Sequence, residues 1–133
     1  MPVKSDPRQW TDPRHVTGLE GEELAIRYLE RRGWDILDHR YRMGRLEIDI
    51  VARRGCTVAF VEVKTRWSRA FGDPLEAVTW TKKREIERVA KAWVDRCGTA
   101  ADRYRFDVIG VSFRRGRRPR IEHVQDAFRA GWR

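Results

Sequence analysis

The stretch Leu46–Arg66, LEIDIVARRGCTVAFVEVKTR, contains two strand-like segments separated by a short turn. Thr57–Arg66 is rich in β-branched residues, and Leu46–Ala52 alternates apolar and acidic side chains. Both patterns are typical of β-strands. Arg54-Gly55 lies between the segments and predicts a hairpin turn at these two residues. The stretch therefore predicts two neighbouring antiparallel strands.

Each of these strands has an apolar face and a charged face, because side chains alternate along a strand. Glu62 and Lys64 share one face of their strand, and Glu47 and Asp49 share one face of theirs. A two-residue loop at 54–55 would place Glu47 opposite Glu62, and a four-residue loop at 54–57 would place Asp49 there. A three-residue loop would put the carboxylates on opposite faces of the sheet. The sequence leaves this choice open.

Carboxylates that share one face repel each other and need a compensating cation. A hard divalent ion such as Mg²⁺ binds one or two carboxylates together with water and phosphate oxygens. Lys64 would point into the same space as Glu62, where it could position a water molecule or neutralise charge on a phosphate. These groups suffice for metal-assisted hydrolysis of a phosphodiester. The competing interpretation is an ordinary solvated face with a surface Glu-Lys pair.

The segments around this stretch predict helices on both sides of it. Apolar residues repeat at helical spacing from Gly18 until Gly33, and again over Ala77–Cys97. The other predicted elements are strands at Trp34–Tyr41 and Tyr104–Phe113, a loop at 67–75, a solvated turn at Arg114–Arg120, a short strand at Ile121–Val124 and a final helical turn at Asp126–Ala130. The order α-β-β-β-α-β predicts an α/β fold with a mixed sheet flanked by helices.

Chain length and net charge limit the classes of function that the sequence supports. The 133 residues suit one domain, predicted over 17–133 after a flexible arm at 1–16 that is rich in proline. Lys and Arg total 29 against 20 Asp and Glu, a net charge of +9, which favours a polyanionic partner, most often a nucleic acid. The absence of a long apolar run excludes an integral membrane protein, and the absence of a signal sequence predicts a cytoplasmic location. Cys56 and Cys97 are too few for a disulfide framework or a Cys-based zinc site.

Several segments together resemble the YraN family of bacterial proteins. The matching segments are GLEGEELA from Gly18, EIDIV from Glu47, FVEVKTR from Phe60, RFDV from Arg105 and EHV from Glu122, with Phe71-Gly72 and Lys82 between them. That family is regarded as a distant relative of archaeal Holliday-junction resolvases. The resemblance implies a restriction-endonuclease-like fold of the PD-(D/E)xK type, whose core has the same α-β-β-β-α-β order.

The resemblance also implies a set of catalytic residues. Asp49 matches the metal-binding Asp, Glu62 and Lys64 match the E-x-K pair, and Glu22 matches the Glu of the first helix. Asp49, Glu62 and Glu22 would then be the ligands of Mg²⁺ or Mn²⁺. Arg40 and Leu46 depart from the pattern, because they stand where the family commonly has Asn and Gly. Leu46 lies on the apolar face and is expected to add packing.

The predicted function is therefore a metal-dependent nuclease that acts on branched or flapped nucleic acid, with DNA favoured over RNA as the predicted substrate. Arg66, Trp67, Arg69 and Lys82 are the predicted nucleic-acid-binding residues, with Trp67 available to stack on a base. Because resolvases act as dimers on two-fold-symmetric junctions, the resemblance also implies a homodimer. The alternative is a non-catalytic nucleic-acid-binding or adaptor protein that keeps the fold. Asp107 is interpreted as a structural partner for an Arg.

Overall fold

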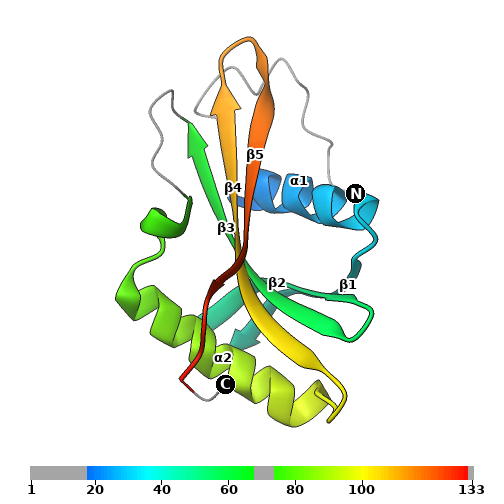
Figure 1. The fold of residues 1–133 in the computed structure, drawn as a ribbon. Helices are drawn as coiled ribbons and strands as arrows, with labels where there is room; N and C mark the ends of the chain where they lie inside the picture. The colour runs from blue at the N-terminus through cyan, green and yellow to red at the C-terminus, as the bar shows by residue number, and fades with distance from the viewer. Residues whose placement is uncertain (1–17, 68–73, 132–133) are drawn as a thin grey trace.

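The computed structural model describes residues 18–67 and 74–131, which form a five-stranded sheet with helices on both faces (Figure 1). The strands lie in the order β1-β2-β3-β4-β5; β3 and β4 are parallel and the other neighbours are antiparallel. This arrangement confirms the predicted mixed sheet flanked by helices, and β5 extends it. The elements are α1 (Gly18–Arg31), β1 (Asp35–Met43), β2 (Leu46–Arg54), β3 (Thr57–Trp67), the 3₁₀ helix η3 (Pro74–Ala77), α2 (Trp80–Cys97), β4 (Arg103–Arg114) and β5 (Arg117–Phe128).

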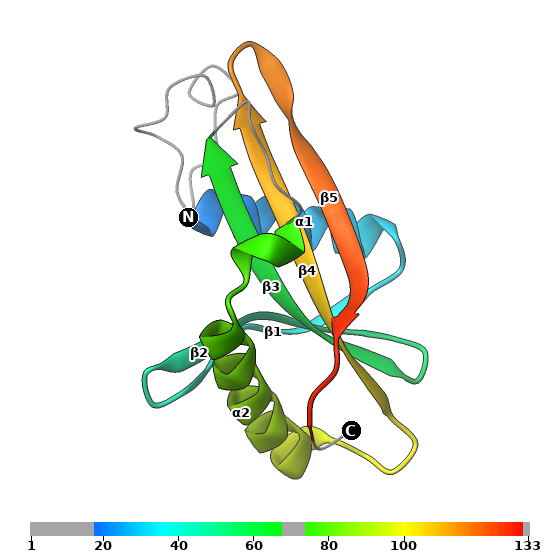
Figure 2. The same ribbon diagram turned by 60° about the vertical axis from the view of Figure 1, so that its left-hand side comes forward.

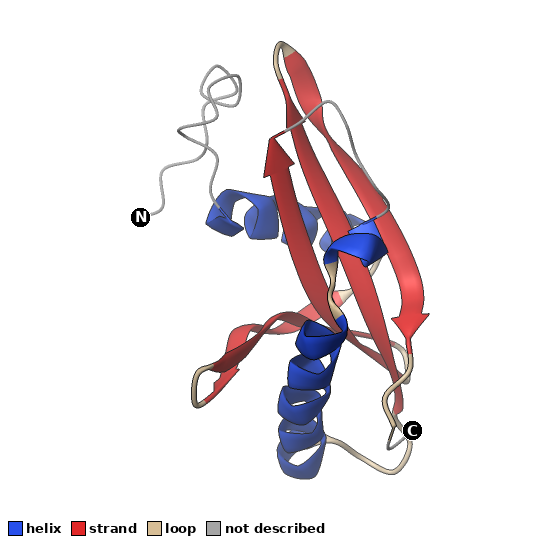
Figure 3. Ribbon diagram, turned by 90° about the vertical axis from the view of Figure 1, so that its left-hand side faces the viewer, coloured by secondary structure: helices blue, strands red, loops and turns tan. Residues whose placement is uncertain are grey.

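The two helices cover opposite faces of the sheet, because alternate residues of the central strands enter different apolar clusters. Phe60 and Phe106 pack with Val89 and Trp93 of α2. Val61, Ile109 and their neighbours pack instead with Ala25 and Leu29 of α1. In Figure 3 α1 and α2 accordingly lie on different sides of the β3–β5 strands.

The hairpin between β2 and β3 resolves the register that the sequence left open. Arg54 pairs with Thr57, so the turn is Gly55-Cys56, with Gly55 at φ +62°. The turn predicted at Arg54-Gly55 is wrong by one residue, because the left-handed backbone that Gly provides is needed at the first turn position. The register continues to the pair Ile50–Val61 and, extended by one residue, sets Asp49 opposite Glu62.

Pairing between β2 and β3 stops at Ile50–Val61, whereas β2 stays paired with β1 as far as Leu46. The first residues of β2 therefore leave β3 and follow β1 away from the centre of the sheet, as Figure 2 shows. Asp49 is the first residue beyond the last β2–β3 pair. The functional candidates thus lie where two strands of the sheet diverge.

The second helix begins later than predicted. Thr79 is its N-cap, and its side chain accepts a hydrogen bond from the backbone N–H of Lys82 at 3.1 Å. Pro74–Ala77 forms a separate 3₁₀ turn before it. The start predicted at Ala77 is wrong because a capping Thr satisfies the free N–H groups of the first turn only from the position that it occupies.

The C-terminal region also differs from the prediction. Arg117–Phe128 is one long strand, so the solvated turn shrinks to residues 115–116 and the helical turn at Asp126–Ala130 is absent. Asp126 has φ +49°, at a register shift that ends with Phe128 opposite Phe106. The two rings are stacked with centroids 4.9 Å apart. This long-range contact outweighs the local preference for a turn.

Candidate functional site

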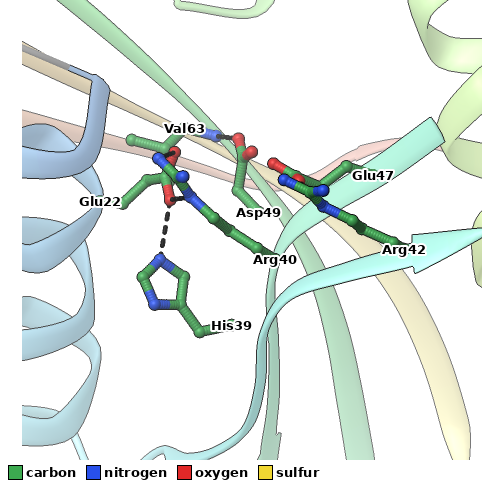
Figure 4. A network of polar contacts seen from close by, with 7 residues as sticks. All are labelled: Glu22, His39, Arg40, Arg42, Glu47, Asp49 and Val63. Carbon is green, nitrogen blue, oxygen red and sulfur yellow. Dashed lines mark hydrogen bonds and ion pairs between the residues drawn. The ribbon is translucent and has the colours of Figure 1, made fainter. Parts of the chain in front are cut away.

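Asp49 lies at the point where β2 separates from β3 (Figure 4). Its Oδ2 atom accepts a hydrogen bond from the backbone N–H of Val63 at 2.8 Å. The carboxylate therefore satisfies a backbone donor that the departing strand leaves without a partner. The half-buried Asp49 side chain is thereby held against β3 at Val63, the residue that follows Glu62.

Glu62 is buried on the α2 side of β3, where two lysines approach it. Lys64 Nζ lies 3.5 Å from Glu62 Oε2, and Lys82 Nζ of α2 lies 4.0 Å from the same atom. The other oxygen, Oε1, is buried and has no hydrogen-bond partner among the described residues. The structure therefore brings Lys82, which the sequence suggested only as a nucleic-acid contact, to the carboxylate of the E-x-K pair.

Burial and the neighbouring carboxylates raise the pKa of the Asp49 carboxyl from 3.8 to about 8. Burial is the largest cause, because a charged carboxylate loses hydration there. The negative charges of Glu62 and Glu22 add to the rise, and the hydrogen bond from Val63 opposes it. The Asp49 carboxyl therefore lies close enough to Glu62 and Glu22 for their charges to disfavour its ionised form.

We expect Asp49→Asn to stabilise the protein at pH 8 when no divalent ion is present. Because the folded pKa of Asp49 lies above its unfolded value, its contribution to stability is complete below about pH 4 and is lost as the pH rises to about 8. The wild-type free energy of unfolding should fall by roughly 1–3 kcal/mol over this range, and the variant should show no such fall. Urea unfolding in EDTA at pH 4.5, 6 and 8 measures the difference.

Asp95→Asn is the matched control, because Asp95 is exposed and pairs only with Lys91 in the described structure. Titration of Asp102 does not contribute to the change in unfolding free energy between pH 4.5 and 8. Its bidentate hydrogen bonds with Arg53 lower the pKa of its carboxyl, so it titrates below this pH window. Equal pH dependence in wild type and Asp49→Asn would contradict the raised pKa.

Glu22 reaches the same region from the start of α1. At Gly21 a Cβ atom would lie 1.9 Å from Thr65 Oγ1, so the helix touches β3 as closely as only glycine allows. Glu22 is buried, and its Oε1 atom lies 2.7 Å from His39 Nε2 and 2.9 Å from Arg40 Nε. Its charge contributes to the raised pKa of Asp49, so the structure brings the predicted first-helix Glu near the pair.

Arg40 is the cation that compensates this acidic region, and sequence reasoning did not identify its role. It lies across from Asp49, between the pairs His39–Ile50 and Tyr41–Ile48, and has φ +58°. Its pKa is raised, first by the hydrogen bond to Glu22 and also by the charges of Glu22, Glu47 and Asp49. The sequence does show that Arg40 stands where the family commonly has Asn. Only the fold reveals that its partner is Glu22. Figure 4 shows its guanidinium between Glu22 and Asp49.

The other residues singled out in the sequence lie at the end of β3, at the start of β2 or outside the described residues. Trp67 is half-buried and packs against the α1-side cluster, next to Arg66 at the end of β3. Arg69 and the arm at 1–16 lie outside the described residues. Leu46 packs against the α2-side cluster, as expected of the residue that replaces Gly.

The described part of the structure offers a metal ion two carboxylates and no larger cluster of ligands. Within residues 18–67 and 74–131, no three His, Cys, Asp or Glu side chains form a group that could hold a metal ion. Glu22 is engaged by His39 and Arg40, which leaves Asp49 and Glu62 as the available carboxylates.

No helix of the described part is both long and apolar enough to cross a membrane.

Comparison with known proteins assigns the chain to a family. Residues 21–111 match the model of the uncharacterised protein family UPF0102. A UPF0102 protein of Rhodococcus jostii is 44% identical over 111 residues, which cover 84% of this chain and 94% of that protein. A UPF0102 protein of Geobacter sulfurreducens is 46% identical over 113 residues, which cover 85% and 88% of the two chains. One of Chlorobium phaeobacteroides is 42% identical over 125 residues, which cover 90% and 98%.

The matched region contains α1 from Gly21, the whole of β1 to β3, α2 and most of β4. Asp49, Glu62, Lys64, Glu22 and Lys82 all fall within it. The YraN-like segments at Gly18, Glu47 and Phe60 therefore reflect a relationship that extends over most of the chain. The protein belongs to the UPF0102 family.

Proposed function

We propose that this protein is a metal-dependent nuclease that hydrolyses phosphodiester bonds in DNA, with Asp49, Glu62 and Lys64 at its centre. One observation supports the proposal above all others. Asp49 and Glu62 are held side by side where β2 leaves β3, and Lys64 Nζ lies 3.5 Å from Glu62 Oε2. This is the residue set that the resemblance to restriction-endonuclease-like proteins implies.

The carboxylate pair suits Mg²⁺ or Mn²⁺. Asp49 and Glu62 would hold the ion, because hard cations prefer carboxylate oxygens and complete their shells with water and phosphate. Glu62 Oε1 is buried and accepts no hydrogen bond from the described residues, and a cation would offset both the burial and the Glu62 charge that raise the pKa of Asp49. When bound, the ion would supply Lewis-acid stabilisation of charge on the phosphate.

The side chains of the protein would supply the remaining steps. Lys64 would orient the water that attacks phosphorus and neutralise negative charge on the phosphate as the bond to the leaving sugar oxygen breaks. Lys82, on the same side of Glu62, would hold a neighbouring phosphate. Glu22 stays a predicted ligand, and it would have to exchange Arg40 for the ion.

The first test is calorimetric titration with Mg²⁺ and Mn²⁺. Wild type should show saturable heat, and Glu62→Gln, which keeps the shape of the side chain but loses its charge, should show none. The same preparations are then incubated with single-stranded, duplex, flapped and four-way-junction DNA. Cleavage by wild type and not by Glu62→Gln is the expected result.

The alternative is a non-catalytic adaptor that binds nucleic acid. One observation favours it: Arg40 and His39 already satisfy Glu22, so one of the four predicted catalytic groups is engaged within the protein. A wild-type protein that binds junctions but shows neither metal heat nor cleavage on any of the four substrates would replace the nuclease proposal with this one.

A further inference from the structure

The outward face of α2 carries one aromatic residue and three cations, followed by Asp95, which pairs with Lys91 at 2.7 Å. Trp80, Arg84, Arg88 and Lys91 are all exposed and follow each other at helical spacing. The opposite face carries the buried residues of the helix, so these four side chains have no role in its packing. We call these four residues the α2 track.

Trp80 is unusual because it is a large apolar side chain with 71% of its surface exposed. The guanidinium of Arg84 lies over its ring, with Cζ 4.9 Å from the centroid. Such a contact holds the indole in place while most of it stays accessible. A fixed, exposed indole beside cations is suited to stacking on a nucleic-acid base.

The track borders a hollow of about 720 Å³ between α2, the β1–β2 hairpin and the C-terminal segment. Its cationic lining residues are Arg84, Arg88, Lys91 and Arg129. The one acidic lining residue is Glu87, and its Oε1 atom accepts a hydrogen bond from the backbone N–H of Gly131 at 2.7 Å. Lys91 pairs with Asp95 and Arg129 pairs with Asp126, so Arg84 and Arg88 contribute most of the positive charge. The lining has a net positive charge, and its occupant should be an anion with apolar parts.

The track begins at the N-terminal end of α2, the end that also carries Lys82. Trp80 and Lys82 are two residues apart and point to different sides of the helix, and Lys82 Nζ lies 4.0 Å from Glu62 Oε2. From Trp80 to Lys91 the helix rises about 16 Å, which spans several phosphates of one strand. A strand whose phosphate lies near Glu62 would therefore pass around the N-terminal end of α2 to reach the track.

We propose that the α2 track binds an unpaired nucleic-acid strand that leads to or from the cleaved phosphate. Arg84, Arg88 and Lys91 pair with its phosphates, and one base stacks on Trp80. The strand is unpaired because both faces of a base inside a duplex are covered by its neighbours. This inference rests on the proposed nuclease function and specifies its substrate as DNA with a single-stranded segment next to the cleaved bond.

Binding in EDTA tests the track without any cleavage. The probes are a fluorescently labelled oligothymidylate of about 15 nucleotides and a blunt duplex of equal length, measured by fluorescence anisotropy. Trp80→Ala should weaken binding of the single strand about 10-fold and binding of the duplex less than about 2-fold. Trp80→Phe should restore most of the loss, because its ring can still stack.

The charge contribution is tested by the salt dependence. Arg84→Ser/Arg88→Ser should reduce the slope of log affinity against log salt for the single strand by about 1.4, since each phosphate contact contributes about 0.7. Arg27→Ser/Arg31→Ser is the matched control. These two arginines are exposed at the same spacing on α1, on the other face of the sheet, and their loss should leave the slope nearly unchanged.

Three results would overturn the inference: unchanged single-strand binding by Trp80→Ala, an equal loss for strand and duplex, or an equal slope change in the control pair. Tight binding of polyglutamate that also depends on Trp80 would indicate an acidic protein partner and overturn it as well. Circular dichroism verifies that each variant is folded. Failure of the nuclease proposal is separate, because it appears as absent metal heat and absent cleavage while strand binding by the track persists.

Discussion

Asp49→Asn and Lys64→Ala should each reduce DNA cleavage by about 100-fold or more, but only Asp49→Asn should abolish metal binding. Asp49→Asn removes a charge that the ion needs, so its calorimetric heat should disappear together with activity. Lys64→Ala should keep the heat, because a charged lysine has no lone pair to offer a cation. Initial cleavage rates and Mn²⁺ titrations on the same preparations measure both effects.

Binding of DNA in EDTA adds a third readout. Asp49→Asn should bind as tightly as wild type or more tightly, since a carboxylate near a phosphate is repulsive when no ion is present. Asp35→Asn makes the same chemical change at an exposed position at the start of β1, away from the α2 track, and should retain full activity. Residual cleavage that is equal in all purified variants would reveal a contaminating nuclease. Full activity of Lys64→Ala beside an inactive Asp49→Asn would remove Lys64 from the mechanism.

Asp107→Ala should lower the free energy of unfolding by about 3–5 kcal/mol, the usual cost of removing one partner from a buried ion pair. The Asp107 side chain is fully buried and accepts two hydrogen bonds from Arg105, both at 3.0 Å. It also contacts His123 Nε2 at 2.7 Å and the backbone N–H of Asp126 at 3.0 Å. Removing the carboxylate leaves Arg105 and the buried His123 without this partner.

This network connects distant elements, which is why its loss should be global. The Asp107 carboxylate joins β4 to β5 through His123, and His123 Nδ1 lies 3.2 Å from Tyr28 Oη of α1, so the network reaches all three elements. Urea unfolding gives the loss, and Asp107→Asn, which keeps one oxygen acceptor, should lose less. Asp95→Ala breaks an exposed pair and should cost about 0.5 kcal/mol or less. A loss below about 1 kcal/mol for Asp107→Ala would show that the network does not hold these elements together.

Local patterns in the sequence were sufficient to predict the fold class and the Glu62–Lys64 half of the candidate site. Strand alternation put Glu62 and Lys64 on one face of β3, and the structure has Lys64 Nζ 3.5 Å from Glu62 Oε2. The structural interpretation of Asp107 as an Arg partner is confirmed by Arg105, two residues away on the same strand. These features depend on neighbours in the chain, so a periodicity of two residues predicts them.

Features that depend on loop length or on long-range contacts could not be predicted in the same way. The register of β2 against β3 follows from the position of Gly55 in the turn, and a shift of one residue would have moved Asp49 to the other face. The strand at Asp126–Phe128 exists because Phe128 stacks on Phe106, which overrides a local preference for a turn.

The sequence by itself determined which acidic and basic side chains were available and which faces of their own strands they occupy. Only the tertiary structure decided their partners: Arg40 forms an ion pair with Glu22, His39 lies within hydrogen-bond distance of it, and α2 brings Lys82 to Glu62. The physical reason is that alternation along a strand is local, whereas the charge balance of a site sums over elements far apart in the chain. Asp49 shows this most clearly, because its raised pKa arises from burial and from Glu62 and Glu22, which α1 and β3 bring to it.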